Sequence, residues 1–192
     1  MSFVEFYSFN ISIVHPARDQ YESVRVKAAR HPEESPAYLH ARVFALAHAY
    51  REGLEFSEGF FDPKAPAIWA HDLFEQITAW IELGAPDREK IQRALRRNPK
   101  AEFRIYFYDQ EQIDLFCHYL RGSTSNWVAP VQFYLLDRRF LEQSAELLTS
   151  SSRWEITFAD ETAYATINGM EFETTVSQVN IWQRYQESIE NA

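Results

Sequence analysis

The chain changes from apolar to basic around one short stretch, Trp80-Ile81-Glu82-Leu83-Gly84-Ala85-Pro86-Asp87. The residues up to Leu83 are typical of an apolar strand, and Glu82 is a charged side chain near its end. Gly84 allows close backbone approach. The stretch Gly84-Ala85-Pro86-Asp87 interrupts the strand and predicts that a helix starts after it. This stretch therefore predicts a strand that runs directly into a helix, with a carboxylate at the junction.

The predicted helix has an apolar side and a basic side. Its apolar stripe consists of Ile91, Ala94 and Leu95, and its cations gather on the other side at Lys90, Arg93 and Arg97. Seven basic and two acidic residues between positions 88 and 104 give this segment a charge of +5, in a chain whose net charge is −9. Such a run is typical either of a solvated helix face or of a contact with an anion such as phosphate.

Upstream, the sequence predicts a hairpin followed by a helix. Apolar and polar residues alternate from Tyr7 to Ile13, as in a half-buried strand, and a second extended segment runs from Tyr21 to Ala28. Ser35 followed by Pro36 is a typical helix start. Gly53 is expected to end this helix.

The rest of the chain alternates between strands and helices. Further strands are predicted at residues 54–60, 66–71, 76–84, 103–107, 131–136, 153–158 and 163–167. Further helices are predicted at residues 113–120 and 140–148. The alternation between 77 and 136 implies crossover connections and a mixed sheet. We therefore expect an α/β fold, a mixed sheet flanked by helices, in a single domain over residues 1–192.

The composition is typical of a globular intracellular protein. Hydrophobic residues make up 46% of the 192 residues and aromatic residues 16%, which excludes a disordered chain. No apolar run reaches the roughly 18–20 residues that cross a bilayer, and the first residues lack the basic region of a signal peptide. Cys117 is the only cysteine, so no intramolecular disulfide can form, and we expect a cytoplasmic protein without a membrane partner. The net charge of −9 argues against nucleic-acid binding by bulk electrostatics.

Glu82 is the residue that most strongly indicates a site. A carboxylate in an apolar strand is costly to bury unless it is paired or binds a cation. Beside a basic helix it suits a hard metal ion that handles a phosphate group. It equally suits a structural ion pair with Lys90 or Arg93. The residues alone leave both interpretations open.

Other reactive side chains give weaker signals. The six histidines show no metal-binding spacing and are expected to be packing or surface residues. Cys117 lies next to an apolar stripe and is expected to be a buried structural thiol. The tryptophans at 127, 154 and 182 could stack on bases, but we expect them to pack in the core or at an interface.

Several motifs, taken in order, resemble the YaeQ family. They are Ala29-Arg30-His31-Pro32 with Glu34, Leu54-Glu55-Phe56 with Gly59, Pro66-Ala67 with Trp69, Trp80-Ile81-Glu82-Leu83-Gly84 with Pro86, and Leu136-Asp137. The resemblance spans nearly the whole chain. Its most specific part is the block that begins at Trp80, eleven residues after Trp69.

The resemblance implies a fold similar to the PD-(D/E)XK nucleases, the restriction endonuclease-like fold, with an added N-terminal hairpin. In that superfamily, acidic residues at the ends of adjacent strands hold magnesium, and a nearby lysine helps to activate water for phosphodiester hydrolysis. The resemblance places Glu82 at the second acidic position and Glu34 at the family's glutamate before the first helix. Glu82 would hold magnesium together with a substitute for the missing acid, which would be Asp72, Glu58 or Glu34.

The same resemblance assigns roles to the basic helix. Lys90 and Arg93 would act with Glu82 in catalysis by gripping the phosphate, and Lys90, Arg93 and Arg97 would contact nucleic acid. Arg93 stands where some members carry lysine, but an arginine stays protonated and is a poor general base.

Some positions depart from the family pattern. Ala65 and Ala67 stand where other members have an acidic residue, and Thr78 replaces a frequent aspartate. The sequence therefore predicts a nuclease-like module with a degenerate magnesium site, weakly active or non-catalytic, which binds nucleic acid or a protein. The alternative is a magnesium-dependent nuclease. The sequence does not define the oligomeric state.

Overall fold

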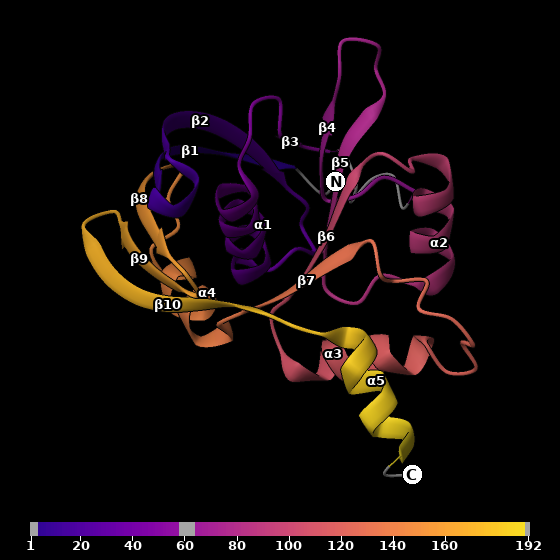
Figure 1. Cartoon of the computed structure of the whole chain (residues 1–192). Coiled ribbons are helices and arrows are strands. Elements are labelled where there is room, and N and C mark those ends of the chain that lie inside the picture. Colours follow the sequence, from indigo (N-terminus) through magenta and orange to yellow (C-terminus); the bar gives the residue numbers. More distant parts are fainter. Residues whose placement is uncertain (1–3, 58–63, 191–192) are drawn as a thin grey trace. The chain divides into compact units, whose positions relative to one another are not determined.

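The computed structural model describes residues 4–57 and 64–190, and the chain divides into two compact units (Figure 1). The first unit contains Met1–Arg51 and Leu136–Ser177, and the second contains Glu52–Leu135 and Gln178–Ala192. Each unit is thus built from two segments that are distant in the sequence. The expectation of a single domain over residues 1–192 stays a prediction.

Five strands form the sheet of the first unit in the order β2-β1-β8-β9-β10. Their bounds are β1 Glu5–His15, β2 Gln20–Arg30, β8 Ser151–Ala159, β9 Thr162–Ile167 and β10 Met170–Gln178. The antiparallel pair β1–β2 confirms the predicted N-terminal hairpin, and the short 3-10 helix η1, Pro16–Arg18, connects its arms. β8 runs parallel to β1, whereas the pairs β8–β9 and β9–β10 are antiparallel.

Two helices pack on each other in the first unit: α1, Pro36–Ala49, and α4, Arg138–Ala145. As predicted, α1 begins after Ser35, whose hydroxyl oxygen accepts the backbone N–H of Tyr38 at 3.1 Å. Eleven consecutive residues of α1, from Leu39 to Ala49, are buried. The ring of Phe44 contacts Phe140 of α4 and Phe158 of β8, so aromatic side chains join the helices to the sheet.

The sheet of the second unit has the order β7-β6-β5-β4-β3. Its strands are β3 Glu55–Phe56, β4 Ile68–His71, β5 Ile77–Leu83, β6 Glu102–Phe107 and β7 Val131–Leu136. β5, β6 and β7 are parallel, and the helices α2, Arg88–Arg97, and α3, Gln110–Tyr119, connect them. The predicted crossovers and mixed sheet are therefore confirmed. A last helix, α5, Ile181–Glu190, packs against α3.

Three elements differ from the prediction. β3 is limited to Glu55–Phe56, and residues 58–60 of the predicted strand lie outside the described residues. β10 and α5 were not predicted, because most of their residues are polar and only two of each are buried. Among the described residues, no helix has the length and apolar character needed to cross a membrane.

Candidate functional site

Glu82 lies at the junction of β5 and α2, where the sequence placed it. Gly84 has a φ of 78°, a left-handed conformation that favours glycine, and its N–H donates to the Tyr106 carbonyl of β6 at 2.9 Å. Asp87 caps α2, because its Oδ1 accepts the backbone N–H of Lys90 at 2.8 Å. This tight connection allows the first turn of α2 to reach the end of β5.

The Glu82 carboxylate is buried and engaged by two donors. Lys90 Nζ lies 2.8 Å from Glu82 Oε1, and Trp80 Nε1–H donates to the same oxygen at 3.0 Å. Glu82 is only 5% exposed, and burial raises the pKa of its carboxyl group, while the Lys90 ammonium opposes that shift. Of the two interpretations of Glu82, the structure contains the ion pair with Lys90.

A cavity of about 430 Å³ adjoins this ion pair. We call it the α2 cavity; Trp69 of β4 and Ile77 and Trp80 of β5 give it an apolar wall. The α2 residues that line it are Glu89, Lys90, Arg93, Ala94 and Arg97, with Asp87 and Asn98 at the helix ends and Lys64 and Ala65 before β4. The cavity thus combines aromatic surface with a mainly basic rim, which contains four basic and two acidic residues.

Arg93 and Arg97 are the side chains of this rim that are available to contact a ligand. Both are exposed, and neither forms an ion pair or a hydrogen bond with the residues at 4–57 and 64–190. They lie one helical turn apart, so both guanidinium groups can reach one anionic ligand. Lys90, by contrast, is held by Glu82. The three residues that the sequence predicted to contact nucleic acid therefore lie together. Lys90 is already paired with the Glu82 carboxylate, whereas the two arginines have no such partner in the described structure.

Asp72 lies in the turn between β4 and β5, beyond the far end of β5 from Glu82. Its Oδ1 accepts the backbone N–H groups of Phe74 at 2.8 Å and Gln76 at 2.9 Å. Ten residues separate Asp72 from Glu82, and the β5 segment alone is about 20 Å long at ~3.3 Å per residue. The structure therefore does not bring these two predicted metal ligands together.

Glu34 lies in the first unit, in the connection from β2 to α1. The Arg42 guanidinium of α1 reaches both of its carboxylate oxygens, with Nε 2.8 Å from Oε1 and Nη2 2.9 Å from Oε2. The backbone N–H of His31 donates to Oε2 at 3.1 Å, and Arg42 also donates to the Ala29 carbonyl at 2.7 Å. Burial raises the pKa of Glu34 and Arg42 opposes it. Glu34 thus ties the start of α1 to the end of β2.

These acidic residues do not fit a magnesium centre in the arrangement observed. Magnesium is usually bound through one or two carboxylates that leave room for water and substrate oxygens. Glu82 is instead occupied by Lys90, and Asp72 closes a turn. Within the described part of the chain, no three His, Cys, Asp or Glu side chains are grouped so that they could hold a metal ion. Glu58 lies outside the described residues.

The model of the YaeQ protein family matches residues 3–176. The chain belongs to the YaeQ family. It is 24% identical over 139 residues to "Uncharacterized protein YaeQ" of Escherichia coli (strain K12), covering 72% of this chain and 76% of that protein. The protein of the same name in Salmonella typhi is 22% identical over 154 residues, covering 80% of this chain and 83% of that protein.

Two crystal structures of YaeQ proteins have the same fold. The YaeQ protein of Pseudomonas syringae has a TM-score of 0.79 at 24% identity, covering 92% of this chain and 96% of that one. The YaeQ protein of Xanthomonas axonopodis pv. citri has a TM-score of 0.82 at 19% identity, covering 92% and 98%. The expected α/β architecture of mixed sheet and flanking helices is therefore confirmed as that of YaeQ structures.

Lys90→Met tests the ion pair of this YaeQ-family chain. We expect the free energy of unfolding to fall by about 2 kcal/mol near pH 8, and by less near pH 5. The sign follows because burial raises the pKa of Glu82 in the folded state, and the loss of Lys90 raises it further. Folded molecules then hold a proton that unfolded ones release, so stability falls as pH rises above the ordinary pKa of glutamate.

Urea unfolding at both pH values measures this effect. Lys100→Met is the matched control, because Lys100 is exposed and does not line the α2 cavity. An equal loss at both pH values would contradict a buried carboxylate neutralised by Lys90.

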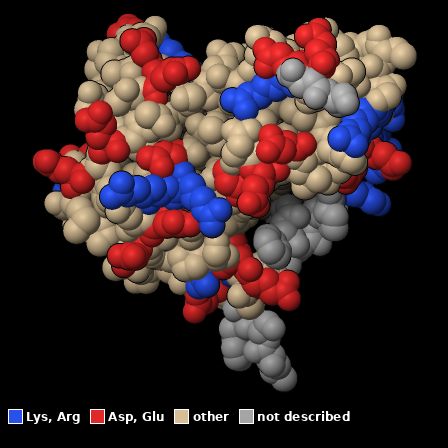
Figure 2. Space-filling model, turned by 90° about the horizontal axis from the view of Figure 1, so that it is seen from below, with Lys and Arg blue, Asp and Glu red and all other residues tan. Residues whose placement is uncertain are grey.

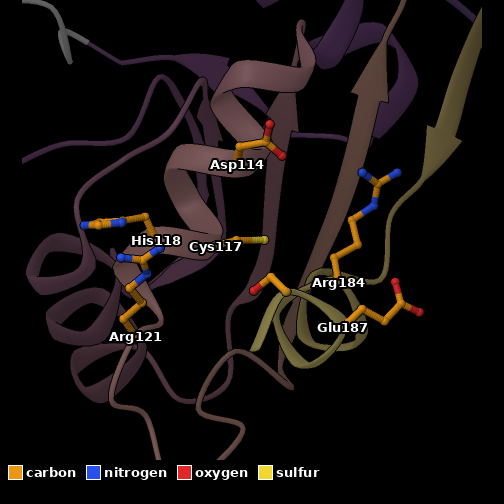
Figure 3. A pocket seen from close by; sticks show the side chains of 7 residues that line it. Asp114, Cys117, His118, Arg121, Arg184 and Glu187 are labelled. Carbon is orange, nitrogen blue, oxygen red and sulfur yellow. The ribbon is translucent and has the colours of Figure 1, made fainter. Parts of the chain in front are cut away.

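A second cavity, of about 570 Å³, lies between α3 and α5 of the second unit (Figure 3). Cys117 points into it, with His118 and Arg121 on one side and Arg184 and Glu187 contributed by α5. The expectation of a buried thiol is only partly met, because Cys117 is half-buried. Burial raises the pKa of the Cys117 thiol, as does Asp114, so the thiol is not activated as a nucleophile.

Proposed function

We propose that the second unit binds single-stranded nucleic acid in the α2 cavity without cleaving it. The observation that carries this proposal is the pair Arg93 and Arg97, which lack acidic partners in the described structure and share a cavity with Trp69. Guanidinium groups match the geometry of phosphate oxygens, and an aromatic ring offers a stacking surface to any base.

The contact would be local rather than a broad electrostatic attraction. The chain has a net charge of −9, and the face shown in Figure 2 carries basic and acidic side chains close to one another. A small number of phosphate contacts would give a weak dependence of affinity on salt. The chain has one cysteine and therefore cannot form an intramolecular disulfide, as is usual in the cytoplasm. A cytoplasmic location is part of this proposal.

A lost hydrolytic site is part of the proposal. The parallel pair β5–β6 with antiparallel β4, and a carboxylate at the end of β5, support a variant of the PD-(D/E)XK core. In a working site of that type, the acid would hold magnesium and a lysine would activate water. Here Glu82 and Lys90 neutralise each other, which favours binding without hydrolysis.

Fluorescence anisotropy with short labelled RNA and DNA strands tests the binding. We expect Arg93→Gln/Arg97→Gln to weaken binding about tenfold and to reduce the slope of log affinity against log salt by about 1.4, or ~0.7 per phosphate contact. The control is Arg96→Gln/Lys100→Gln, which removes the same charge from exposed positions outside the cavity. Equal weakening in both double variants would contradict a specific site at Arg93 and Arg97.

A nuclease assay separates the proposal from its alternative. We expect no cleavage of single- or double-stranded DNA or RNA with magnesium or manganese, in the wild-type protein or in Glu82→Gln. Metal-dependent cleavage that disappears in Glu82→Gln would instead establish the magnesium-dependent nuclease, with Glu82 as a metal ligand and Lys90 released from it.

A further inference from the structure

The turn between β4 and β5 carries the two most exposed large hydrophobic side chains of the described residues. Leu73 is 99% exposed and Phe74 is 82% exposed. We call Asp72–Gln76 the hairpin tip. Within the second unit it extends beyond α2 (Figure 1). Singly scattered exposed apolar residues are common on protein surfaces, whereas these two are adjacent and form one apolar patch on a projecting turn.

The hairpin tip is conformationally fixed. Asp72 closes it from both ends, because its N–H donates to the Gln76 carbonyl at 2.9 Å and its carbonyl accepts the N–H of Glu75 at 3.0 Å. Its carboxylate accepts two further backbone N–H groups, those of Phe74 and Gln76. Glu75 adopts a φ of 61° to complete the turn. The backbone that presents Leu73 and Phe74 is thus organised before any contact forms, which lowers the entropy lost on binding.

The chemistry of the tip matches one surface of the same chain. Leu73 and Phe74 are flanked by the carboxylates of Asp72 and Glu75, so a suitable receptor has an apolar floor and a basic rim. The α2 cavity has an apolar floor at Ile77 and Trp69 and the guanidinium groups of Arg93 and Arg97 at its rim, where the carboxylates of Asp87 and Glu89 also lie. Its volume of about 430 Å³ lies in the range of pockets that hold a small ligand, roughly 300–1,000 Å³, and so accommodates an aromatic side chain.

The positions of tip and cavity allow reciprocal contact between two copies. Trp69 precedes Leu73 by four residues and Ile77 follows Phe74 by three, so the cavity begins about 10–13 Å from the tip at ~3.3 Å per residue. Two hairpins related by a two-fold axis through their midpoints lie antiparallel. Each tip then lies over the cavity of the other copy, which closes the assembly at two.

We infer that two copies of this chain associate through their β4–β5 hairpins, each inserting Leu73 and Phe74 into the α2 cavity of the other. The inference depends on the tip and the cavity and does not rest on the proposed function. The dimer nevertheless has a consequence for the proposed function, because an α2 cavity that is filled by a hairpin tip cannot bind a nucleotide strand. Nucleic acid and self-association then compete for Arg93 and Arg97.

Sedimentation velocity over a wide range of protein concentrations, without nucleic acid, tests the association. We expect a monomer–dimer equilibrium whose Kd rises about 100-fold in Phe74→Ser, because each dimer loses two aromatic contacts. Met170→Ser is the control; Met170 is 51% exposed and lies in β10 of the first unit. Monomers at every concentration, or a dimer that Phe74→Ser leaves unchanged, would overturn the inference.

Charge reversal identifies the receptor. Glu75→Arg and Arg93→Glu/Arg97→Glu should each weaken the dimer, and high salt should weaken it in the wild type. A dimer that survives Arg93→Glu/Arg97→Glu unchanged would contradict the α2 cavity as the receptor. Circular dichroism spectra matching the wild type show that these variants fold.

Two further measurements separate other uses of the tip. Vesicles of phosphatidylcholine with phosphatidylglycerol should not bind the protein, because acidic residues flank the tip and repel the anionic lipid. If monomers do bind the vesicles and Phe74→Ser abolishes this binding, the tip would be assigned to a membrane instead. Phe74→Ser should retain its affinity for nucleic acid at concentrations where the wild type is monomeric. Failure of the proposed function is thus read from anisotropy, and failure of the dimer from sedimentation.

Discussion

Arg42→Met is expected to lower the free energy of unfolding by about 3–5 kcal/mol, because it leaves a buried carboxylate without its partner. Only 7% of the Arg42 side chain and none of the Glu34 side chain is exposed. Arg42 bonds to both oxygens of Glu34 and to the Ala29 carbonyl, so its removal also leaves a backbone acceptor of β2 with one partner fewer. Urea unfolding near neutral pH measures the loss.

An exposed ion pair of the same residue types supplies the control. Arg153 and Glu155 approach to 3.0 Å, but their side chains are 79% and 51% exposed, so Arg153→Met should cost well under 1 kcal/mol. The double variant Arg42→Met/Glu34→Leu should recover part of the stability lost in Arg42→Met, because it removes the unpaired charge as well. A loss in Arg42→Met no larger than that in Arg153→Met would contradict the buried pair.

This pair also explains what the sequence could not reveal about Glu34. The resemblance selected Glu34 as a metal ligand, and its position before Ser35 and Pro36 placed it correctly at the start of a helix. Its partner lies eight residues further on, at the second turn of α1, where a single arginine has no distinctive spacing. The ion pair depends on α1 being buried on all sides, and the sequence does not reveal this because His40, Arg42 and His48 interrupt its apolar residues.

The site beside α2 was more accessible to prediction. The position of Glu82 beside the basic helix followed from a strand that runs directly into a helix, and the shared side of Lys90, Arg93 and Arg97 followed from helical spacing. The sequence left open whether Lys90, Arg93 or a metal ion would neutralise Glu82, and the structure shows that Lys90 does. The aromatic wall was missed because Trp69 and Trp80 are eleven residues apart. Their direct pairing in the antiparallel hairpin becomes clear only once the register is known.

Titration of buried His40 should lower the stability of the chain as the pH decreases from about 6.5 to about 4. His40 is fully buried in α1, with its ring 4.9 Å from that of Trp154, and burial lowers its pKa to about 4. The Ser144 hydroxyl donates to the Leu141 carbonyl at 3.3 Å, so the 3.0 Å contact between His40 Nδ1 and Ser144 Oγ has the imidazole as donor. His40 Nε2 is then a bare acceptor without a hydrogen-bond partner in the described structure.

Protonation of His40 would therefore create a buried N–H with no acceptor and a charge among aromatic rings. Between about pH 6.5 and pH 4 the unfolded chain binds this proton and the folded chain does not, so the contribution of His40 to stability is complete above the upper value and is lost as pH falls. At ~1.4 kcal/mol per pKa unit, the loss over the whole window is about 3.5 kcal/mol. Urea unfolding at several pH values should show that the stability of the wild type falls toward pH 4 by about that amount more than the stability of His40→Gln. Leu39→Ala, at a neighbouring fully buried position of α1, separates packing from titration, because it should lower stability equally at every pH. A pH profile of His40→Gln parallel to that of the wild type would show that the proton responsible binds elsewhere.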